Sequence, residues 1–539
     1  MNTRQQETFF HVAVWLLGCH LAFVSFLTAG SIFSAIFGAP LVVNRERFSL
    51  LCSLRLAILL NLPFFLFCRY KHYWLFNLRV HGAQQAPVYV SQDRILGRDH
   101  SRDIQAALKE HRFTDMLGEY FDRAGPTHWV RLFHTWVLQT RDHEIMKAMY
   151  GTQNADWDIG GARQASTAVA LGRHSIFAIN GPEWRHTRAM MRPTFVRNQI
   201  ADLECTDRHA ENFLRRLPRD GTDCVDVQEL LYMFTMDIST DFMFGHSTDT
   251  LMNPTEESAE FSRSFDLLLL TAATQSRVGW FGSFRKDRNA DRIIKTCNDF
   301  VDAHIANAKK NEKRQERAYV FMNELIDSGA SPEEIRSQLL SMIVGGRDTS
   351  ASVLTSMLWV LARRSDIVVK IRQELADLNG QKPTWDQLRN LKYLNNVLKE
   401  TLRLYAPVTT NSRVANKDTV LPRGGGEDGQ SPLFVPKGTT CRFSTYHIHR
   451  DEGFYGKDVN EFRPERWDTL RPKWEYVPFA GGPRICIGQQ FALAQMLYLA
   501  TRLFQTFSSI EAGDDKPMVQ QVGTTIHLVN GCLVRLKPQ

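Results

Sequence analysis

The stretch Phe479-Ala480-Gly481-Gly482-Pro483-Arg484-Ile485-Cys486-Ile487-Gly488 places one cysteine in a loop of small and turn-forming residues. An amphipathic run follows at once, so a helix is expected to begin where the loop ends. Gly481, Gly482 and Gly488 permit positive φ and close approach to the main chain, which allows a large flat group to lie against it. Backbone N–H groups and the helix N-terminus would stabilise a thiolate at Cys486. The loop therefore predicts a cysteine thiolate presented to a flat cofactor.

Residues of this loop meet every fixed position of the pattern Phe-x-x-Gly-x-Arg-x-Cys-x-Gly: Phe479, Gly482, Arg484, Cys486 and Gly488. The pattern resembles the haem-binding signature of the cytochrome P450 superfamily. The resemblance implies haem b, with Cys486 as the thiolate ligand of the iron and with Arg484, Phe479 and Gly488 beside the cofactor. Arg484 is long enough to reach a carboxylate of that group. The alternative is an ordinary buried cysteine in a glycine-rich turn.

Composition restricts the class of protein further. The chain has 539 residues, no internal repeat and a formal net charge of +7. No run of lysine and arginine and no ladder of aromatic residues indicates a nucleic-acid partner. The mild basic excess suits an acidic electron-donor protein or an anionic membrane surface. The nine cysteines are scattered singly, which argues against a disulfide framework or a zinc site and favours a reducing compartment.

The N-terminal part differs from the rest of the chain. Residues 9–37 are mostly apolar and contain no Asp, Glu, Lys or Arg, which predicts a transmembrane helix, because a span needs about 20 residues. The arginines that follow place that end in the cytosol by the positive-inside rule. A second apolar stretch, 56–68, is short and contains a proline, so it is a second span, a re-entrant piece or an interfacial helix. We expect a membrane-anchor region over 1–75 and a haem-thiolate catalytic domain over 76–539; the alternative is a core segment of a soluble protein.

A long helix is predicted from Ser331 to about Arg364. Ser331 stands at the N-cap, proline follows at the first helical position, and Glu334 stands at the third. Gly345 and Gly346 lie near the middle of the helix, where each costs about 1 kcal/mol against alanine. They leave space where side chains would otherwise stand, which suits a groove for dioxygen and ordered water.

The glycine pair continues into Arg347-Asp348-Thr349, and the whole segment resembles the superfamily motif that handles dioxygen. The resemblance implies that Thr349 holds the hydrogen bond to bound dioxygen and that Asp348 gates proton delivery. Helical spacing places a set of residues on one face: Gln338, Met342, Gly345, Gly346 and Thr349. We expect that face to look at the haem and the substrate, with Arg347 pointing away. The alternative is a kinked core helix.

Other segments resemble superfamily positions that bind the haem propionates. Trp184 and Arg188 are four residues apart, hence on one helical face, and match the Trp-x-x-x-Arg pattern of the third helix. Arg413, in a predicted strand, matches a further propionate-binding position. Residues 151–174 are rich in glycine and alanine, and the resemblance implies an irregular, mobile loop over the substrate.

Glu400 and Arg403 can pair on one face of a helix predicted over 388–404. They match the superfamily motif Glu-x-x-Arg, and Arg466 lies in the matching Pro-Glu-Arg-aromatic segment. The resemblance implies a buried network of these three residues that fixes the loop carrying the cysteine. Such a network must be fully satisfied, because a lone buried charge costs several kcal/mol. We therefore assign it a structural role and no catalytic one.

After Pro407 the pattern changes to short strands, expected at 409–414, 419–421, 433–435 and 440–443. The glycine-rich segment 424–429 lacks the Lys-Ser/Thr and the following helix of a phosphate loop, so it predicts a turn between strands. With the helical segments before and after, these strands predict a mainly α fold with small β-sheets. The superfamily resemblance covers about residues 90–539 and implies the cytochrome P450 fold, preceded by the N-terminal transmembrane anchor.

A narrower resemblance rests on segments within 340–500. These segments are similar to the fungal alkane and fatty-acid hydroxylase family, which is family 52 of the superfamily. The segments are 345–349, 421–429, 446–450 and 486–493. This resemblance implies hydroxylation of a fatty acid, an alkane or a fatty-acyl-like chain at or near its terminal carbon. We expect the pocket wall to be apolar or weakly polar and to contain Met342, Gly345, Val408, Thr409 and Thr525.

The resemblance implies a monooxygenase that takes two electrons from an NADPH–cytochrome P450 reductase, splits O₂ and inserts one oxygen atom into a C–H bond. It further implies the endoplasmic reticulum membrane, with membrane lipid as a partner and the catalytic domain facing the cytosol. Two alternatives stay open. One is a pathway-specific monooxygenase of fungal secondary metabolism that acts on another lipophilic intermediate. The other is a haem-thiolate isomerase or haem sensor, although isomerase-type relatives often lose the Asp-Thr pair that this chain keeps.

Overall fold

The computed structural model describes residues 73, 75, 77–78, 82–93, 97–132, 135–195, 202–278, 288–310 and 320–539. The chain divides into two compact units, residues 1–83 and 84–539, and each is described by itself. In the first unit, the Asn77 side chain donates a hydrogen bond to the Tyr73 carbonyl oxygen at 2.8 Å. The predicted span at 9–37 and the apolar stretch at 56–68 lie outside the described residues. Within the described ranges, no helix combines the length and the apolar character that crossing a membrane requires.

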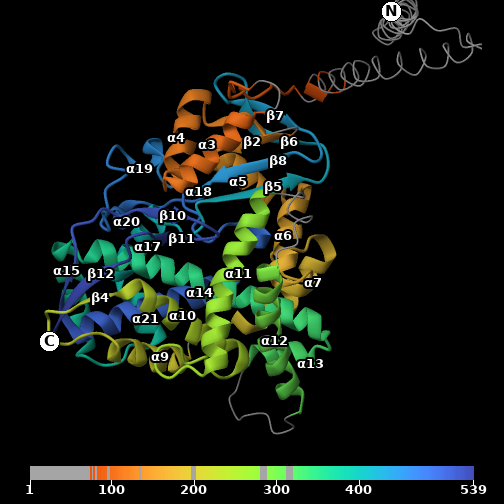
Figure 1. The fold of residues 1–539 in the computed structure, drawn as a ribbon. Coiled ribbons are helices and arrows are strands. Elements are labelled where there is room, and N and C mark those ends of the chain that lie inside the picture. Colours follow the sequence, from red (N-terminus) through yellow and green to blue (C-terminus); the bar gives the residue numbers. More distant parts are fainter. Residues whose placement is uncertain are drawn as a thin grey trace, which may run out of the picture. The chain divides into compact units, whose positions relative to one another are not determined.

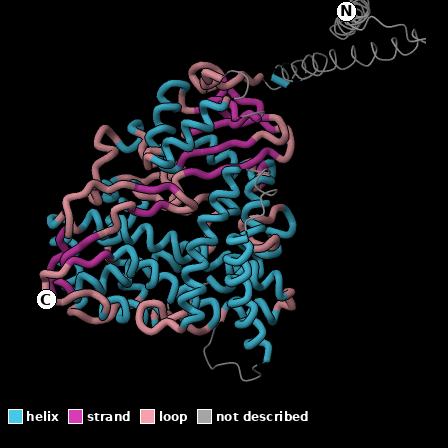
Figure 2. The backbone as a smooth tube through the Cα atoms, in the orientation of Figure 1, coloured by secondary structure: helices cyan, strands magenta, loops and turns pink. Residues whose placement is uncertain are grey.

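The second unit is mainly helical, as Figure 2 shows. The longer helices, labelled in Figure 1, are α3 (Arg98–Lys109), α4 (Phe113–Ala124), α6 (Gly161–Leu171), α7 (Gly181–Met191), α9 (Glu204–Arg215), α10 (Val227–Phe244), α11 (Glu256–Val278), α12 (Arg288–Lys310), α14 (Pro332–Leu361), α15 (Ser365–Leu375), α17 (Lys392–Leu404) and α21 (Gln489–Thr506). Shorter helical segments are α5 (His143–Lys147), η1 (Ala148–Thr152), η2 (Asn154–Asp156), η3 (Arg192–Phe195), α13 (Phe321–Asp327), η5 (Ala376–Leu378), α16 (Trp385–Asn390), α18 (Thr445–Ile448), α19 (Glu452–Tyr455), α20 (Arg466–Thr469) and η6 (Gly482–Arg484).

The described strands form small sheets. Their bounds are β1 (Thr127–Leu132), β2 (Thr135–Thr140), β3 (Trp157–Asp158), β4 (Cys224–Asp226), β5 (Thr410–Ala415), β6 (Thr419–Gly425), β7 (Ser431–Val435), β8 (Thr440–Ser444), β9 (Phe507–Ala512), β10 (Gln520–Val522), β11 (Ile526–Leu528) and β12 (Leu533–Pro538). A five-stranded sheet has the order β1-β2-β8-β5-β3, in which only the β2–β8 pair is parallel. It lies at one end of this unit, beside α3 and α4 (Figure 1). The smaller sheets are β4-β12-β9, β6-β7 and β10-β11.

Helix α14 is the element on which the helical part is built. Its start is as predicted, because the Ser331 hydroxyl accepts from the Glu334 N–H and the Glu334 carboxylate accepts from the Ser331 N–H, a capping box. Residues 335–343 belong to one apolar cluster, together with α6, α7 and α11 to α13. Residues 351–361 belong to a second cluster, with α9, α15, α17 and α21. The middle of α14 therefore lies between two cores.

A close approach of α10 to α14 explains Gly346. A Cβ atom there would lie 2.9 Å from Ser239 Oγ on α10, so any larger residue would require the Ser239 side chain to move. Glycine has a low helix propensity and so destabilises α14 at this position. The packing of α10 against α14 offsets that loss.

The mainly α fold with small sheets is as predicted, and the predicted strands after Pro407 correspond to β5 to β8. The segment 424–429 leads from β6 to β7, also as predicted, with Gly424 and Gly425 at the end of β6 and the turn itself at residues 426–430. Two expectations were wrong. Residues 151–174 are not irregular, because they contain η2, β3 and the three-turn helix α6. The helix expected over 388–404 is two helices, α16 and α17, separated at Leu391, whose extended ψ of 86° stops the first.

Candidate functional site

The cysteine loop is closed by its own backbone. The Cys486 N–H donates to the Phe479 carbonyl oxygen at 3.0 Å, and the Gly488 N–H hydrogen-bonds the Cys486 sulfur. Gly488 is the N-cap of α21, and its carbonyl oxygen accepts from the Ala492 N–H at 2.9 Å. The sulfur is thus presented at the junction between loop and helix, as the sequence predicted.

The glycines of the loop serve different purposes. Gly482 has φ +65°, the left-handed region that favours glycine, and a Cβ there would overlap the Tyr150 carbonyl oxygen. Gly481 is extended, and it is needed because a Cβ would overlap the Trp474 ring. Gly488 has φ −89°, so of the three glycines only Gly482 uses the positive φ that glycine permits.

Burial and the local backbone act in opposite directions on the ionisation of Cys486. The side chain is solvent-accessible, but protein surrounds the thiol on most sides, and burial raises its pKa. The Gly488 N–H and the Arg188 charge act in the opposite direction and do not outweigh burial. A metal ion coordinated to the sulfur would deprotonate it outright, whatever the balance between burial and the loop.

Four arginines converge near this loop, from four different elements: Arg163 on α6, Arg188 on α7, Arg413 on β5 and Arg484 in η6. Arg163 donates to Asn411 Oδ1 at 2.6 Å, and Arg413 approaches the same oxygen at 3.4 Å. Arg484 donates to Asn180 Oδ1 at 3.0 Å, and Arg188 donates to the Ile485 carbonyl oxygen at 2.7 Å. These partners are neutral.

The Trp184 ring ties two of these cations together, with the Arg484 guanidinium 4.3 Å and the Arg188 guanidinium 5.7 Å from its centroid. Burial, followed by the charges of neighbouring arginines, lowers the pKa of Arg484 to about 10. Burial and the Arg413 charge lower the pKa of Arg163 to about 10 as well. In the described part of the chain, no carboxylate forms an ion pair with any of the four arginines, and the buried Arg413 Nε has no hydrogen-bond partner.

This arginine group fits the two carboxylates of haem b. A dianion would neutralise cations that now repel one another and would offer an acceptor to the orphaned Arg413 Nε. Three of the four arginines and Trp184 were expected here from the sequence. Arg163 was missed, because it lies in the segment that was expected to be an irregular loop. A helical pattern in residues 161–171 would have been the signal for it.

The middle of α14 provides the second part of the site. Helix α14 is buried at most positions from 335 to 361, but Gly345, Gly346 and Thr349 are half-buried. The Thr349 hydroxyl donates to the Gly345 carbonyl oxygen, its i−4 partner, at 2.7 Å. A Cβ at Gly345 would stand 3.7 Å from the Phe177 ring, so the segment before α7 borders this part of the helix.

The charged residues next to Gly345 and Thr349 make their ion pairs on another side of α14. Arg347 is buried, and it pairs with Asp348 at 2.9 Å and with Asp266 of α11 at 2.6 Å. Burial raises the pKa of Asp348, and the Arg347 charge only partly counters it. Because Asp266 is half-exposed, the three residues form a chain of charges from the interior to the surface. Arg347 points away from Gly345 and Thr349 as expected.

The network behind the loop is complete. Arg403 donates to both carboxylate oxygens of Glu400, at 2.9 and 2.8 Å, and both side chains have no exposed surface. Arg466 Nε and Trp467 Nε1 also donate to this carboxylate, at 3.3 and 3.0 Å. The Arg463 N–H adds a further hydrogen bond at 3.0 Å.

His449 connects this network to the cysteine loop and was missed in the sequence. Its Nε2 accepts from the Val477 N–H at 2.9 Å, so Nδ1 carries the proton and donates to the Arg403 carbonyl oxygen at 3.1 Å. Val477 in turn accepts from the Ala480 N–H at 3.1 Å, inside the loop. Burial lowers the pKa of His449 to about 3, so the ring is neutral at physiological pH.

The residues expected in the pocket wall differ in how deeply they are buried. Met342 is buried in the apolar cluster at the start of α14, and Gly345 is half-buried. The Ile526 N–H donates to the Pro407 carbonyl oxygen at 3.1 Å, which brings Thr525 next to the segment holding Val408 and Thr409. Thr409 is buried, whereas Val408 and Thr525 are half-buried.

Comparisons with known proteins agree with this geometry. The family profile described as Cytochrome P450 matches residues 104–530. The chain is 39% identical over 468 residues to cytochrome P450 monooxygenase himC of Aspergillus japonicus, a match that covers 85% of this chain and 84% of that protein. It is 38% identical to cytochrome P450 monooxygenase FPY7 of Fusarium mangiferae, over 82% and 87% of the two chains. It is also 35% identical to cytochrome P450 52A13 of Debaryomyces hansenii, over 76% and 83%.

Proposed function

The chain belongs to the cytochrome P450 family and is a monooxygenase, and from this premise we propose that it hydroxylates the alkyl part of a lipophilic substrate. The favoured substrate is a fatty acid, an alkane or a fatty-acyl-like chain, attacked at or near its terminal carbon. The observation that carries this proposal is the half-buried stretch of α14 at Gly345 and Thr349, which the apolar Phe177 ring borders.

When bound, the haem supplies the activation of dioxygen and the insertion of oxygen. Cys486 is proposed as its iron ligand, because the loop fixes the sulfur through the Phe479 and Gly488 backbone. Arg188, Arg413 and Arg484, with Trp184 between two of them, are proposed to hold the two propionates. Arg163 joins this group, since it shares Asn411 Oδ1 with Arg413.

Asp348 is proposed to deliver protons to the face of α14 at Thr349. A carboxyl group whose pKa is raised by burial can hold a proton nearer to neutral pH than an exposed one, here on Oδ2, because Oδ1 accepts from Arg347. Arg347 stays protonated and holds the Asp348 carboxyl group in place, because it pairs with both Asp348 and the half-exposed Asp266. Thr349 is proposed to orient dioxygen, for which its hydroxyl would share or leave the Gly345 carbonyl.

The apolar wall explains why an alkyl segment, not a charged head group, would lie at the reaction centre. None of Met342, Gly345, Val408, Thr409 and Thr525 is ionisable. Each buried methylene contributes at most about 0.8 kcal/mol, so Kd should fall by up to about fourfold per added methylene until the channel is filled. The polar end of an amphipathic substrate is proposed to lie toward the channel mouth.

The second candidate, a pathway-specific monooxygenase acting on another lipophilic intermediate, is supported by one observation. The identities to the Aspergillus and Fusarium proteins, 39% and 38%, exceed the 35% to the Debaryomyces family 52 protein. Both candidates share the same haem site, so only the substrate distinguishes them. We further propose a location at the endoplasmic reticulum membrane, with electrons from NADPH through a cytochrome P450 reductase.

The test is a series of saturated fatty acids and alkanes added to the full-length holoenzyme with reductase and NADPH. We expect a type-I spectral shift whose Kd falls with chain length, and a product hydroxylated at or near the terminal carbon. A lipophilic metabolite panel is run in parallel. No shift and no product across the chain-length series, with a shift for a panel member, would replace the first candidate by the second. Turnover without reductase would contradict the electron-transfer proposal.

A further inference from the structure

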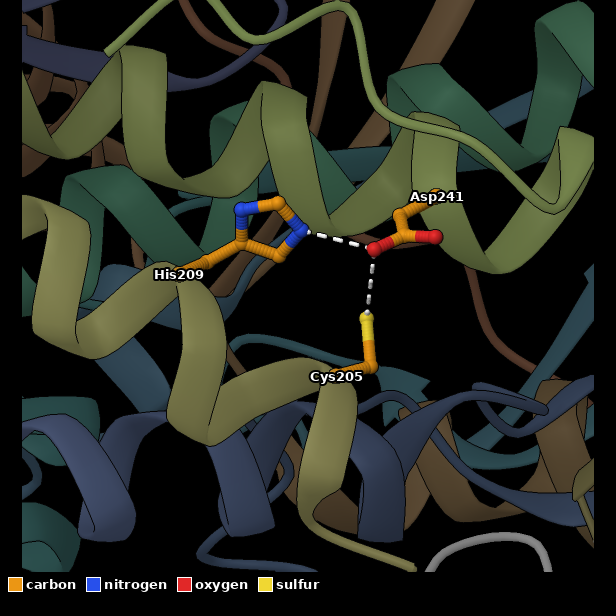
Figure 3. A group of neighbouring side chains, drawn as sticks. All are labelled: Cys205, His209 and Asp241. Atoms are coloured by element: carbon orange, nitrogen blue, oxygen red, sulfur yellow. Dashed lines mark hydrogen bonds and ion pairs between the residues drawn. The ribbon is translucent and has the colours of Figure 1, made fainter. Parts of the chain in front are cut away.

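Three side chains with metal-binding atoms meet at the contact between α9 and α10, and the haem site uses none of them. Cys205 Sγ lies 3.5 Å from Asp241 Oδ2, and His209 Nε2 lies 2.8 Å from the same oxygen (Figure 3). All three ligand atoms lie within 4.8 Å of one another. Cys205 and His209 are four residues apart on α9, so one helical face presents both, and Asp241 faces them from α10.

The spacing suits a small tetrahedral ion. Zinc binds thiolate sulfur at about 2.3 Å and imidazole nitrogen or carboxylate oxygen at about 2.0 to 2.2 Å, which sets ligand–ligand separations of about 3.3 to 3.8 Å. The Cys205–Asp241 separation already lies in that range. The His209–Asp241 hydrogen bond would lengthen by about half an ångström as the ion replaces the shared proton.

The charge at this position is now balanced without a metal. The Asp241 carboxylate is buried, and Arg208 pairs with the same Oδ2 atom that meets Cys205 and His209. The Arg208 side chain is 39% exposed, so it can turn into solvent without losing a buried place. A divalent ion would take over the neutralisation of Asp241 and of a Cys205 thiolate, which leaves the group neutral.

His209 can change from hydrogen-bond donor to metal ligand, and the only hydrogen bond it would lose among the described groups is the one to Asp241. His209 is 2% exposed, and its Nδ1 has no partner among the described groups. Figure 3 shows Nε2 directed at Asp241 and the other ring nitrogen directed away from the group. Nε2 is thus the atom placed to ligate, and no protein acceptor holds the ring in its present tautomer.

We propose that Cys205, His209 and Asp241 form a zinc-binding site that clamps α9 to α10, with water as the fourth ligand. On binding, the Sγ–H bond breaks and its proton goes to solvent, a Zn–S bond forms, and the imidazole proton moves from Nε2 to Nδ1. The Asp241–Arg208 pair opens as the Zn–O bond forms. No electron transfer is involved, and Cys205 is not in a disulfide.

The scattered cysteines argued against a zinc site, and this proposal departs from that expectation. Sequence spacing identifies zinc sites through Cys-x-x-Cys pairs, and here one helix supplies only two ligands. The third comes from position 241, which nothing in the sequence connects to position 205. Packing of α9 against α10 is what completes the group.

The test measures zinc directly in the full-length holoenzyme. The protein is incubated with Zn²⁺ and desalted, and the zinc-to-iron ratio is measured by mass spectrometry. We expect about one zinc per haem iron in the unaltered protein and at least a tenfold loss of affinity in Cys205→Ala. The matched control is Cys224→Ala, which removes another accessible cysteine of the described chain and should retain the zinc. X-ray absorption at the zinc edge should show one sulfur neighbour.

Arg208→Gln separates a metal site from a merely structural ion pair. This variant leaves Asp241 without its cation, and we expect it to melt at lower temperature and to regain its melting temperature when Zn²⁺ is added. The double variant Arg208→Gln, Cys205→Ala should not respond. Equal zinc content in the unaltered protein and Cys205→Ala, or no effect of Zn²⁺ on Arg208→Gln, would overturn the proposal. Neither result bears on the haem-dependent reaction.

Discussion

Replacing Glu400 by glutamine tests whether the buried network behind the cysteine loop depends on charge. Both Glu400 oxygens accept from at least two donors: Oε2 from Arg403 and Trp467, and Oε1 from Arg403, Arg466 and the Arg463 N–H. A glutamine amide has one donor end, so either orientation places its NH₂ group against two donors. The substitution therefore removes the charge and also creates clashing hydrogen-bond donors.

The expected cost follows from the burial of the pair. Glu400 and Arg403 have no exposed surface, and breaking such a pair costs about 3 to 5 kcal/mol because one charge is left buried and uncompensated. The matched control is Glu511→Gln. Glu511 pairs with Lys537 at 2.6 Å, but both side chains are about half-exposed, and such pairs contribute about 0 to 1 kcal/mol.

Urea unfolding of the holoenzyme measures the difference. With an m-value of about 3 to 5 kcal/mol/M, which is plausible for a large chain, Glu400→Gln should lower the midpoint by about 1 M and Glu511→Gln by about 0.2 M or less. Loss of haem from Glu400→Gln should accompany the shift, because His449 and Val477 transmit the network to the loop. Equal midpoint shifts in the two variants would refute the reasoning.

Further expectations concern the site, the anchor and pH. Cys486→Ala should remove the red-shifted Soret band that a thiolate ligand gives to the reduced CO complex, and a variant that keeps the band would exclude Cys486 as the ligand. Thr349→Ala should retain haem but release more peroxide per NADPH consumed, and unchanged coupling would contradict its role in orienting dioxygen. Deletion of residues 1–75 should release most of the protein from washed membranes with the CO spectrum intact, and full retention would place the anchor elsewhere. Burial lowers the pKa of a set of histidines to about 3: His100, His447 and His449. Because the unfolded chain takes up these protons below pH 6.5 and the folded protein does not, stability should fall from pH 6.5 toward pH 3, by up to about 1.4 kcal/mol per pH unit for each histidine; a melting temperature that rises on acidification would contradict this.

Local chemistry made much of the fold predictable. The capping box at Ser331 and Glu334 is complete within four residues, so the start of α14 could be read without tertiary information. The turn between β6 and β7 likewise depends on its own glycines, because Gly426 and Gly429 have positive φ. Residues 161–171 were missed because their small side chains give little amphipathic contrast, and glycine content was interpreted as irregularity.

The site residues that belong to a contiguous sequence motif were predictable. Those that come together only through the packing of distant segments were missed. The loop around Cys486 and the pair Glu400–Arg403 carry their pattern in a few residues. Arg163 and His449 gain their roles only because β5 and the segment before Val477 lie beside them in the folded chain.

The group of four arginines has a consequence for how the protein is made. Arg163, Arg188, Arg413 and Arg484 approach one another with neutral partners only, so the newly synthesised chain completes its fold against its own repulsion until a dianion arrives. Haem then acts as a folding ligand, because it binds the native arrangement and not the unfolded chain. Chains that lack it spend more time open and are removed by proteases. We therefore expect the cellular amount of this protein to depend on haem supply as well as on its own synthesis.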